Sequence, residues 1–176
     1  MSAALPGLPK GEVFLTPPHP DWPALFAAEA ARIRSALGAR VLGLEHYGST
    51  SIPGIKAKPV IDLLVGVARL EEADTFSPTM VALGYEDAGD GGVPGHRIFG
   101  LGAARTHICH VVPHEGPEWR TCLAFRDALR ADRALALAYE ALKVELAARH
   151  TKDRAAYTDG KTAFVQAVTA TARSRG

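Results

Sequence analysis

The pattern of apolar and polar positions divides the chain into a mixed αβ part and a purely helical part. After a proline-rich entry, apolar residues recur at helical spacing up to Gly38. This spacing predicts a helix with Asp21 as its N-cap and Gly38 as its end. The positions expected to face the core are Trp22, Leu25, Phe26, Ile33 and Leu37.

Four short stretches have the apolar and β-branched composition of strands, namely 40–48, 58–66, 97–102 and 106–113. The second is almost continuously apolar, which is typical of a central strand covered on both faces. Residues 70–84 are predicted to be helical, with Pro78 either restarting or kinking the helix. Residues 87–96 are rich in glycine and offer few side chains for burial, so a mobile loop is expected there.

From Pro117 onward the pattern is helical, without a strand signal. The sequence therefore predicts an α+β fold, with a mixed αβ body followed by a helical tail. We expect an αβ core over residues 1–116 and a helical part over residues 117–176, packed on that core as a single structural unit.

Composition narrows the class of protein. The 176 residues are 47% hydrophobic and 22% charged, as in a soluble globular protein with one sizeable core. No apolar run approaches the roughly 20 residues that span a bilayer, and the N-terminus lacks a signal-peptide pattern, so a cytoplasmic protein is expected. A net charge of +1 argues against an extended surface for nucleic acid. Cys109 and Cys122 form no paired metal motif.

A small-residue turn lies between the first two predicted strands. Gly48 can adopt backbone angles closed to other residues, and Ser49 and Thr50 add hydroxyl groups beside exposed N–H groups. Such a turn could hold phosphate oxygens if further N–H groups point at the same spot. The same sequence also suits an ordinary turn, and spacing alone does not separate the two interpretations.

Asp62 lies inside the second predicted strand, where an unpaired carboxylate is costly to bury. It needs a partner, which is a metal ion, a set of backbone donors or a lysine. Lys56 and Lys58 are close enough in sequence to form a merely structural ion pair with it.

The segment from Glu45 to Val67 closely resembles the central motif of the GrpB family of bacterial proteins. That motif runs H-x-G-S-T-S, a hydrophobic residue, P-G, a hydrophobic residue, two variable residues, K-P, two hydrophobic residues and D. The matching residues are His46, Gly48, Ser49, Thr50, Ser51, Pro53, Gly54, Lys58, Pro59 and Asp62. The similarity continues through "HICHVV", "FRDALR", "YEALK" and "YTDGKTAFV", so it covers most of the chain.

The resemblance implies a fold and a chemistry. The family is placed in the nucleotidyltransferase superfamily typified by DNA polymerase beta. This implies a mixed sheet flanked by helices, a Gly-Ser turn for the triphosphate and strand carboxylates for Mg²⁺. On that basis Gly48, Ser49, Thr50 and Lys58 are expected to bind a nucleotide, and Asp62 is expected to hold a divalent cation as the catalytic acid.

The chain departs from the superfamily at one position. Active members carry a second acid two residues after the first, so that both carboxylates project from one face and hold two metal ions. Here that position is Leu64, and no acid occurs in the strand predicted over 106–113. Either another ligand substitutes, or the standard reaction is lost.

Histidines are the available substitutes, because neutral imidazole binds divalent metals well. His107 and His110 are three residues apart on a predicted strand and point to opposite faces, so only one of them can face Asp62. We favour His110 as a metal ligand, with His46 as a second. The alternative for each is a buried histidine bonded to a backbone carbonyl.

The helical part pairs residues four apart on single helix faces, namely Arg126 with Arg130, Tyr139 with Lys143 and Tyr157 with Lys161. Such pairs could clamp a base and phosphates, and the positions recur in the GrpB pattern. Arg126, Lys143 and Lys161 are therefore expected to contact the nucleotide. The alternative is a set of solvated helix faces whose long stems cover apolar surface.

His96 and Arg97, at the end of the glycine-rich loop, could close over a ligand. The alternative is that they are ordinary residues of a mobile loop.

Two functions remain open. The first is a nucleotidyltransferase-like protein that binds a small-molecule nucleotide or other phosphate ligand with Mg²⁺ or another divalent cation, and that transfers a nucleotidyl group if it is catalytic. The second, to which Leu64 points, is a non-catalytic nucleotide-binding or regulatory module.

Overall fold

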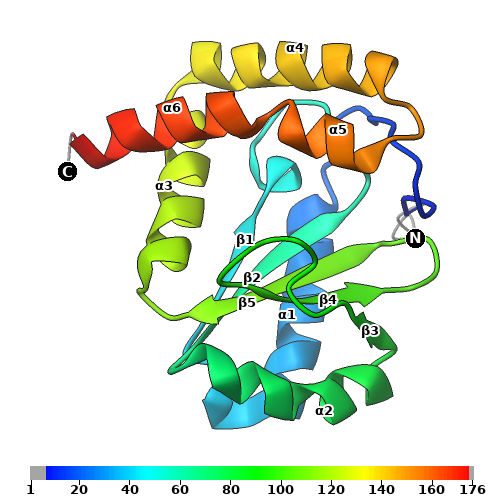
Figure 1. Ribbon diagram of the computed structural model, residues 1–176, viewed down its shortest axis with the longest axis vertical. Coiled ribbons are helices and arrows are strands. Elements are labelled where there is room, and N and C mark those ends of the chain that lie inside the picture. Colours follow the sequence, from blue (N-terminus) through cyan, green and yellow to red (C-terminus); the bar gives the residue numbers. More distant parts are fainter. Residues whose placement is uncertain (1–6, 175–176) are drawn as a thin grey trace.

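The computed structural model describes residues 7–174, which are built around a five-stranded sheet (Figure 1). The strands are β1 (Gly43–Tyr47), β2 (Ile61–Val67), β3 (Tyr85–Asp87), β4 (Arg97–Leu101) and β5 (His107–Pro113). They lie in the order β1-β2-β5-β4-β3. The central pair β2 and β5 is parallel, whereas the other neighbouring pairs are antiparallel. The predicted α+β fold with a mixed sheet is confirmed.

β2 is covered on both faces, as its apolar sequence predicts. Leu63 and Leu64 are successive residues, so their side chains point to opposite faces of the sheet. Both are completely buried. Asp62 shares the face of Leu64, and the register places Leu64 opposite His110 of β5. The alternation along β2 therefore decides which side of the molecule carries the acid.

The first face of the sheet carries the main core. It is covered by α1 (Trp22–Leu37), the 3₁₀ segment η3 (Leu70–Phe76) and α2 (Ser77–Ala82). Gly38 ends α1 with a φ of 60°, as predicted. Asp21 occupies the N-cap position, but its side chain makes no capping hydrogen bond there.

The second face is covered by the C-terminal helices. Trp119 of α3 (Pro117–Ala131) packs against Leu64 and Val112. The helices α4 (Arg133–Arg149), α5 (Arg154–Asp159) and α6 (Thr162–Ser174) follow and lie across one end of the sheet (Figure 1). The segment that links β1 to β2 reaches this layer, where Ile52 and Ile55 pack with Leu129 and other apolar residues of the helices.

The structure adds three details to the sequence prediction. β3 was not predicted, because three residues are too few to show an alternating pattern. The helical stretch after Pro117 is interrupted at Asp132, whose backbone is extended and whose side chain accepts a hydrogen bond from Leu135 N to cap α4. Residues 70–82 form a 3₁₀ segment followed by α2, with Pro78 in the first turn of α2, so the proline restarts the helix. None of the helices in the described part is long and apolar enough to cross a membrane.

Candidate functional site

The turn after β1 rests directly against Asp62. Asp62 pairs with Tyr47 in the antiparallel register, and Gly48 is the next residue of the chain. Gly48 has a φ of 75°, a region that residues with a side chain rarely adopt. A β-carbon at this position would lie 2.9 Å from Cβ and Cγ of Asp62. Glycine therefore lets the backbone of the turn approach the carboxyl group.

Asp62 is partly enclosed and lacks a close counter-ion. Its side chain is 25% exposed, so a ligand could reach it. Within residues 7–174 its one ion-pair distance is 3.9 Å, from Oδ1 to Nε2 of His110, which is too long for a hydrogen bond. Burial raises the pKa of Asp62, and the charges of Lys58, Lys161 and Arg154 act against that rise.

The cations around Asp62 converge from separate parts of the chain. The Nζ atoms of Lys58, which precedes β2, and Lys161, which links α5 to α6, lie over the same ring, at 5.3 and 4.5 Å from the centroid of Tyr157. Lys143 of α4 lies 4.9 Å from the centroid of Tyr139 and donates a hydrogen bond of 2.6 Å to Lys56 O. In the described part of the chain, none of these three ammonium groups has a carboxylate oxygen within 4.0 Å. We call Lys58, Lys143, Lys161 and Arg154 the cation cluster.

Burial and neighbouring positive charges lower the pKa values of these lysines. Burial lowers the pKa of Lys58 to about 7, and the charges of Lys161 and Arg154 act in the same direction. Burial, followed by the charge of Lys161, lowers the pKa of Lys143 to about 7. Burial also lowers the pKa of Lys161 to about 8, against the attraction of Asp62. The cluster is therefore costly to keep fully protonated when no anion is bound.

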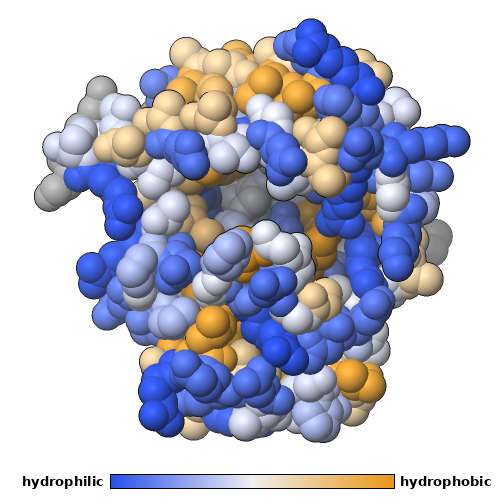
Figure 2. Space-filling view, in the orientation of Figure 1, coloured by the Kyte–Doolittle hydropathy of each residue, from blue (hydrophilic) through white to orange (hydrophobic). Residues whose placement is uncertain are grey.

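The molecule is hollowed at this place. Figure 2 shows a depression between the helices α5 and α6 on one side and the loop between β3 and β4 on the other. Lys161 comes from the first side and His96 from the second. His96 contacts His110, with 3.3 Å between the two Nδ1 atoms. Residues from both walls thus lie next to Asp62 or to its neighbour His110.

The structure brings together most of the predicted residues, but it separates His46 from Asp62. In the register of β1, His46 pairs with Leu63, so its side chain lies on the first face of the sheet. Its ring stacks on Phe26 of α1 at 4.8 Å, and its Nε2 lies 2.9 Å from Thr50 Oγ1. The prediction that His46 ligates a metal together with Asp62 is therefore wrong, because the sheet lies between them. Thr50 likewise turns its hydroxyl away from the acid.

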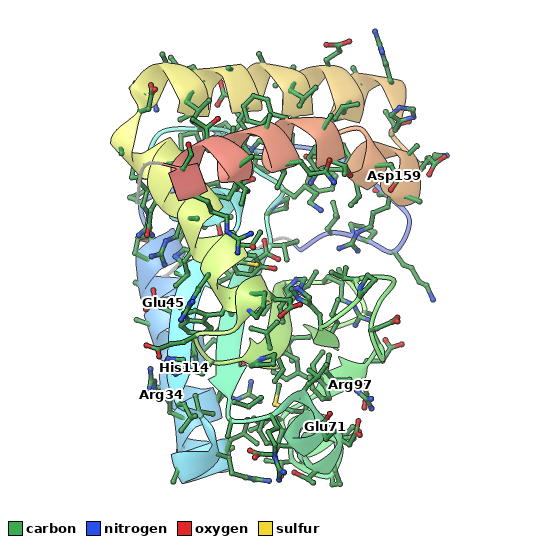
Figure 3. The ribbon with its side chains drawn as sticks, turned by 60° about the vertical axis from the view of Figure 1, so that its left-hand side comes forward. Arg34, Glu45, Glu71, Arg97, His114 and Asp159 are labelled. Atoms are coloured by element: carbon green, nitrogen blue, oxygen red, sulfur yellow. The ribbon has the colours of Figure 1, made fainter. Side chains whose placement is uncertain are left out.

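Arg126 was predicted to contact the nucleotide, but its guanidinium is already paired. It lies 2.7 Å from Glu45 Oε2 and 2.7 Å from Asp127 Oδ1, and it also donates to His46 O at 3.1 Å. Glu45 lies where β1 faces α3 (Figure 3). These contacts tie α3 to β1, and Arg126 is not part of the cation cluster.

The other predicted histidines and Arg97 divide between the two faces. His107 and His110 lie on opposite faces, as their spacing predicted, and His110 is the one that shares the face of Asp62. Arg97 was a candidate for closing over the ligand, but it pairs with Asp87 at 2.7 Å and with Asp74 at 2.8 Å. These bonds hold Arg97 beside η3, where Figure 3 labels it. Of the two residues at the loop end, His96 is the one that contacts His110.

Sequence analysis did not select Arg154. This residue acts on the titration of Lys58, Asp62, His110 and Lys161, so it lies among them. A signal was available, because Arg154, Tyr157 and Lys161 follow one another at intervals of three and four residues and so share one helical face. Tyr139 also adjoins the turn: burial raises its pKa to about 12, and the neighbouring Ser49 side chain opposes that rise.

The donors around Asp62 do not fit a two-metal centre. Leu64, at the place of the usual second acid, is completely buried against Val112 and Trp119. Among residues 7–174, no group of three or more His, Cys, Asp or Glu side chains is arranged to hold a metal ion. The charged groups that act on the Asp62 carboxylate are two lysines and an arginine, so a metal ion bound directly to Asp62 would lie among like charges.

A separate groove of about 300 Å³ lies between α3, α4 and residues 52–54. Arg130 and Arg133 line it, and both donate hydrogen bonds to backbone carbonyls. Arg130 donates to Ser51 O at 3.0 Å, and Arg133 donates to Pro53 O and Gly54 O at 3.1 and 3.2 Å. These bonds fix the link between β1 and β2, so the groove belongs to the support of the turn.

The family model described as GrpB protein matches residues 12–171 of this chain. The chain belongs to the GrpB family. The crystal structure of the conserved protein GrpB from Enterococcus faecalis is similar to it with a TM-score of 0.84 and 35% identity, over 92% of this chain and 98% of that chain. The family resemblance predicted from the segment containing Gly48 and Asp62 is confirmed, and so is the nucleotidyltransferase-like mixed sheet.

Curated relatives extend the similarity beyond one structure. The glutamate-rich protein GrpB of Alkalihalophilus pseudofirmus is 34% identical over 168 residues, which cover 92% of this chain and 97% of the relative. The UPF0157 protein YqkA of Bacillus subtilis is 36% identical over 159 residues, which cover 90% of this chain but 46% of YqkA. This GrpB-family chain thus corresponds to nearly all of one relative and to less than half of another.

The approach of the turn to Asp62 predicts that Gly48→Ala is more destabilising than an equivalent change elsewhere. Gly48 has a φ of 75° and a ψ of −179°, a combination essentially restricted to glycine, so any side chain there costs about 1–3 kcal/mol. Overlap with the Asp62 side chain should add about 1–3 kcal/mol. Gly89→Ala is the matched control, because Gly89 has a φ of 64° and open space around it. Urea unfolding of both variants tests this, and equal losses of stability would contradict it.

The lowered pKa of Lys143 predicts a dependence of stability on pH. Its pKa falls from 10.5 to about 7 on folding, so between these values the unfolded chain holds a proton that the folded chain has lost. Stability should then rise with pH across this window, by up to about 1.4 kcal/mol per pH unit from this group, with the full penalty present below pH 7. Neighbouring Lys161 and Glu140 act on the same titration.

Lys143→Met should remove this contribution. We expect the variant to be more stable than the wild type at pH 6, and the difference should shrink as pH rises towards 10. Lys152→Met, at an exposed position between α4 and α5, is the control and should leave the profile unchanged. Urea denaturation at several pH values measures both, and parallel profiles for Lys143→Met and the wild type would count against the assignment.

Proposed function

We propose that this GrpB-family protein binds a phosphate-bearing small molecule, a nucleotide, in the hollow beside Asp62. The observation that carries the proposal is the cation cluster: Lys58, Lys161 and Arg154 act on the Asp62 carboxylate, and Lys143 acts on Lys58. None of the three lysines has a close ion pair in residues 7–174. Buried or half-buried cations are normally paired, so an unpaired group of them favours an anionic ligand.

The site has parts suited to a polyphosphate. Lysine ammonium groups are mobile point charges that bind phosphate oxygens, and those of Lys58 and Lys161 lie together over Tyr157. The turn at Gly48 and Ser49 also lies against Asp62 and offers backbone and hydroxyl donors. A ligand that spans the hollow would meet both sets of donors.

Asp62 has a role in this proposal that does not depend on a metal. Its charge favours the protonated forms of Lys58 and Lys161. It therefore offsets part of the cost of charging these lysines while no ligand is present, and a phosphate group becomes their main counter-charge on binding. The geometry supports the non-catalytic nucleotide-binding module better than the transferase, because Leu64 occupies the place of the second metal-binding acid.

Calorimetric titration of the full chain with ATP and with pyrophosphate at pH 7 tests the proposal. Lys58→Met and Lys161→Met should each weaken binding by roughly tenfold or more, since a hydrogen bond to a charged group contributes about 1.5–3 kcal/mol. Lys152→Met, which is exposed, should bind as the wild type does. Equal affinities for all four proteins, or no binding by the wild type, would refute the proposal.

The same proteins also distinguish the non-catalytic module from the nucleotidyltransferase. Incubation with labelled nucleoside triphosphates and Mg²⁺ or Mn²⁺ should give binding without pyrophosphate release. Release that is lost in Asp62→Asn would instead establish nucleotidyl transfer. Repeating the calorimetry with a chelator tests the divalent cation, which stays a prediction and would show itself as weaker nucleotide binding without the metal.

A further inference from the structure

We propose that His96 and His110 form a binding site for one divalent transition-metal ion, such as Zn²⁺, at the wall of the hollow. This site is distinct from the Mg²⁺ site that the superfamily places on strand carboxylates, and it does not depend on the nucleotide proposal. Three features of the structure carry it: the spacing of the two imidazoles, the carboxylate behind one of them and the bracing of the loop that carries the other.

The spacing of the two rings suits a shared ion. Their Nδ1 atoms are 3.3 Å apart, and the rings are nearly perpendicular, with centroids 5.4 Å apart. Two zinc–nitrogen bonds of about 2.0–2.1 Å at a tetrahedral angle hold their nitrogens about 3.3–3.4 Å apart. The same distance is long for an N–H···N hydrogen bond, so the nitrogens face each other at the separation that a common ligand would give.

Asp62 lies on the side of His110 that faces away from His96. Its Oδ1 is 3.9 Å from Nε2 of His110, the nitrogen that does not face His96. At this distance no hydrogen bond joins the two groups, but the negative charge of Asp62 favours the tautomer with its proton on Nε2, which leaves Nδ1 with a free lone pair. Tyr47 packs edge-on against the ring of His110, with 5.2 Å between centroids, and fixes its plane.

The loop that carries His96 is braced on both sides. Asp87 accepts hydrogen bonds from Gly89 N and from the guanidinium of Arg97, the residue after His96. Asp90 accepts a hydrogen bond of 2.9 Å from Gly92 N. Gly95 packs against the carboxylate of Glu118 in α3, where a β-carbon would lie 2.8 Å from Oε1. These neighbours thus hold His96 over His110. The position of His96 does not depend on the contact between the two rings alone.

The proposed site is open. Because no third protein donor completes a cage among the described residues, water or an oxygen of a bound anion takes the remaining positions. Imidazole nitrogens suit Zn²⁺, Co²⁺ or Ni²⁺ better than Mg²⁺, which prefers oxygen and keeps its water. We therefore expect Mg²⁺ not to compete at this site.

The test is metal uptake by the full, untagged chain in buffer without phosphate or nucleotide. Competition with a chromophoric chelator should show one Zn²⁺ bound per chain, and Co²⁺ should give the visible spectrum of a low-coordinate nitrogen site. His96→Asn and His110→Asn should each weaken uptake by at least tenfold. Asp62→Asn should also weaken it, because the variant loses a negative charge close to the bound cation.

Matched histidine controls keep the test specific. His46→Asn and His107→Asn remove histidines on the opposite face of the sheet and should bind the ion as the wild type does. Lys58→Met should not weaken uptake, even if it abolishes binding of pyrophosphate, so failure of one proposal is distinguishable from failure of the other. Circular dichroism confirms that each variant is folded. Uptake that is absent from the wild type, or equal in all the histidine variants, would overturn the proposal and leave a histidine–histidine contact that only positions the loop.

Discussion

The candidate binding site depends on a group of lysines that are held together without close carboxylate partners. Burial and mutual repulsion lower the pKa values of Lys58 and Lys143 to about 7 and that of Lys161 to about 8. Asp62 compensates only part of this charge. An arrangement that opposes the stability of the free protein is typical of a binding site, because a ligand of opposite charge removes the penalty.

The fold creates this arrangement by joining two layers at the end of β2. The sheet supplies Asp62 and His110 from adjacent parallel strands, and the C-terminal helices supply Lys143, Arg154 and Lys161. Gly48 allows the turn after β1 to lie against the acid, and Arg126 ties α3 to β1 through Glu45. The link between β1 and β2 is held in turn by Arg130 and Arg133. The hollow therefore needs both parts of the chain, which explains why residues over 100 positions apart act on one carboxylate.

Much of the fold follows from the sequence, because the decisive patterns are local. The apolar run of 58–66 predicted a central strand, and the spacing of His107 and His110 correctly predicted that they lie on opposite faces of the sheet. The three-residue strand β3 and the break at Asp132 were missed, because each depends on pairing or capping that a short window does not show.

The site was predictable in part for the same reason. Gly48, Asp62, Lys58 and Lys161 lie in motifs with recognisable spacing, and the structure brings them together. The error with His46 arose at the end of β1, where the register decides the face and the sequence does not fix the register. Arg126 was misjudged because its partners Glu45 and Asp127 become neighbours only through the packing of α3 on β1. Arg154 was recognised as part of the site only from its neighbours in the structure.

The central claim is that the lysines beside Asp62 lack a counter-charge until an anion binds. Thermal unfolding of the wild type with and without millimolar sulfate, at pH 6.5 and at pH 9 and at constant ionic strength, tests it most directly, because sulfate keeps the same charge at both values. If the claim holds, sulfate raises the melting temperature clearly at pH 6.5, where the lysines are charged, and little at pH 9, where they are largely neutral. A shift of the same size at both values, or a shift that persists when Lys58 and Lys161 are both replaced by Met, would contradict it.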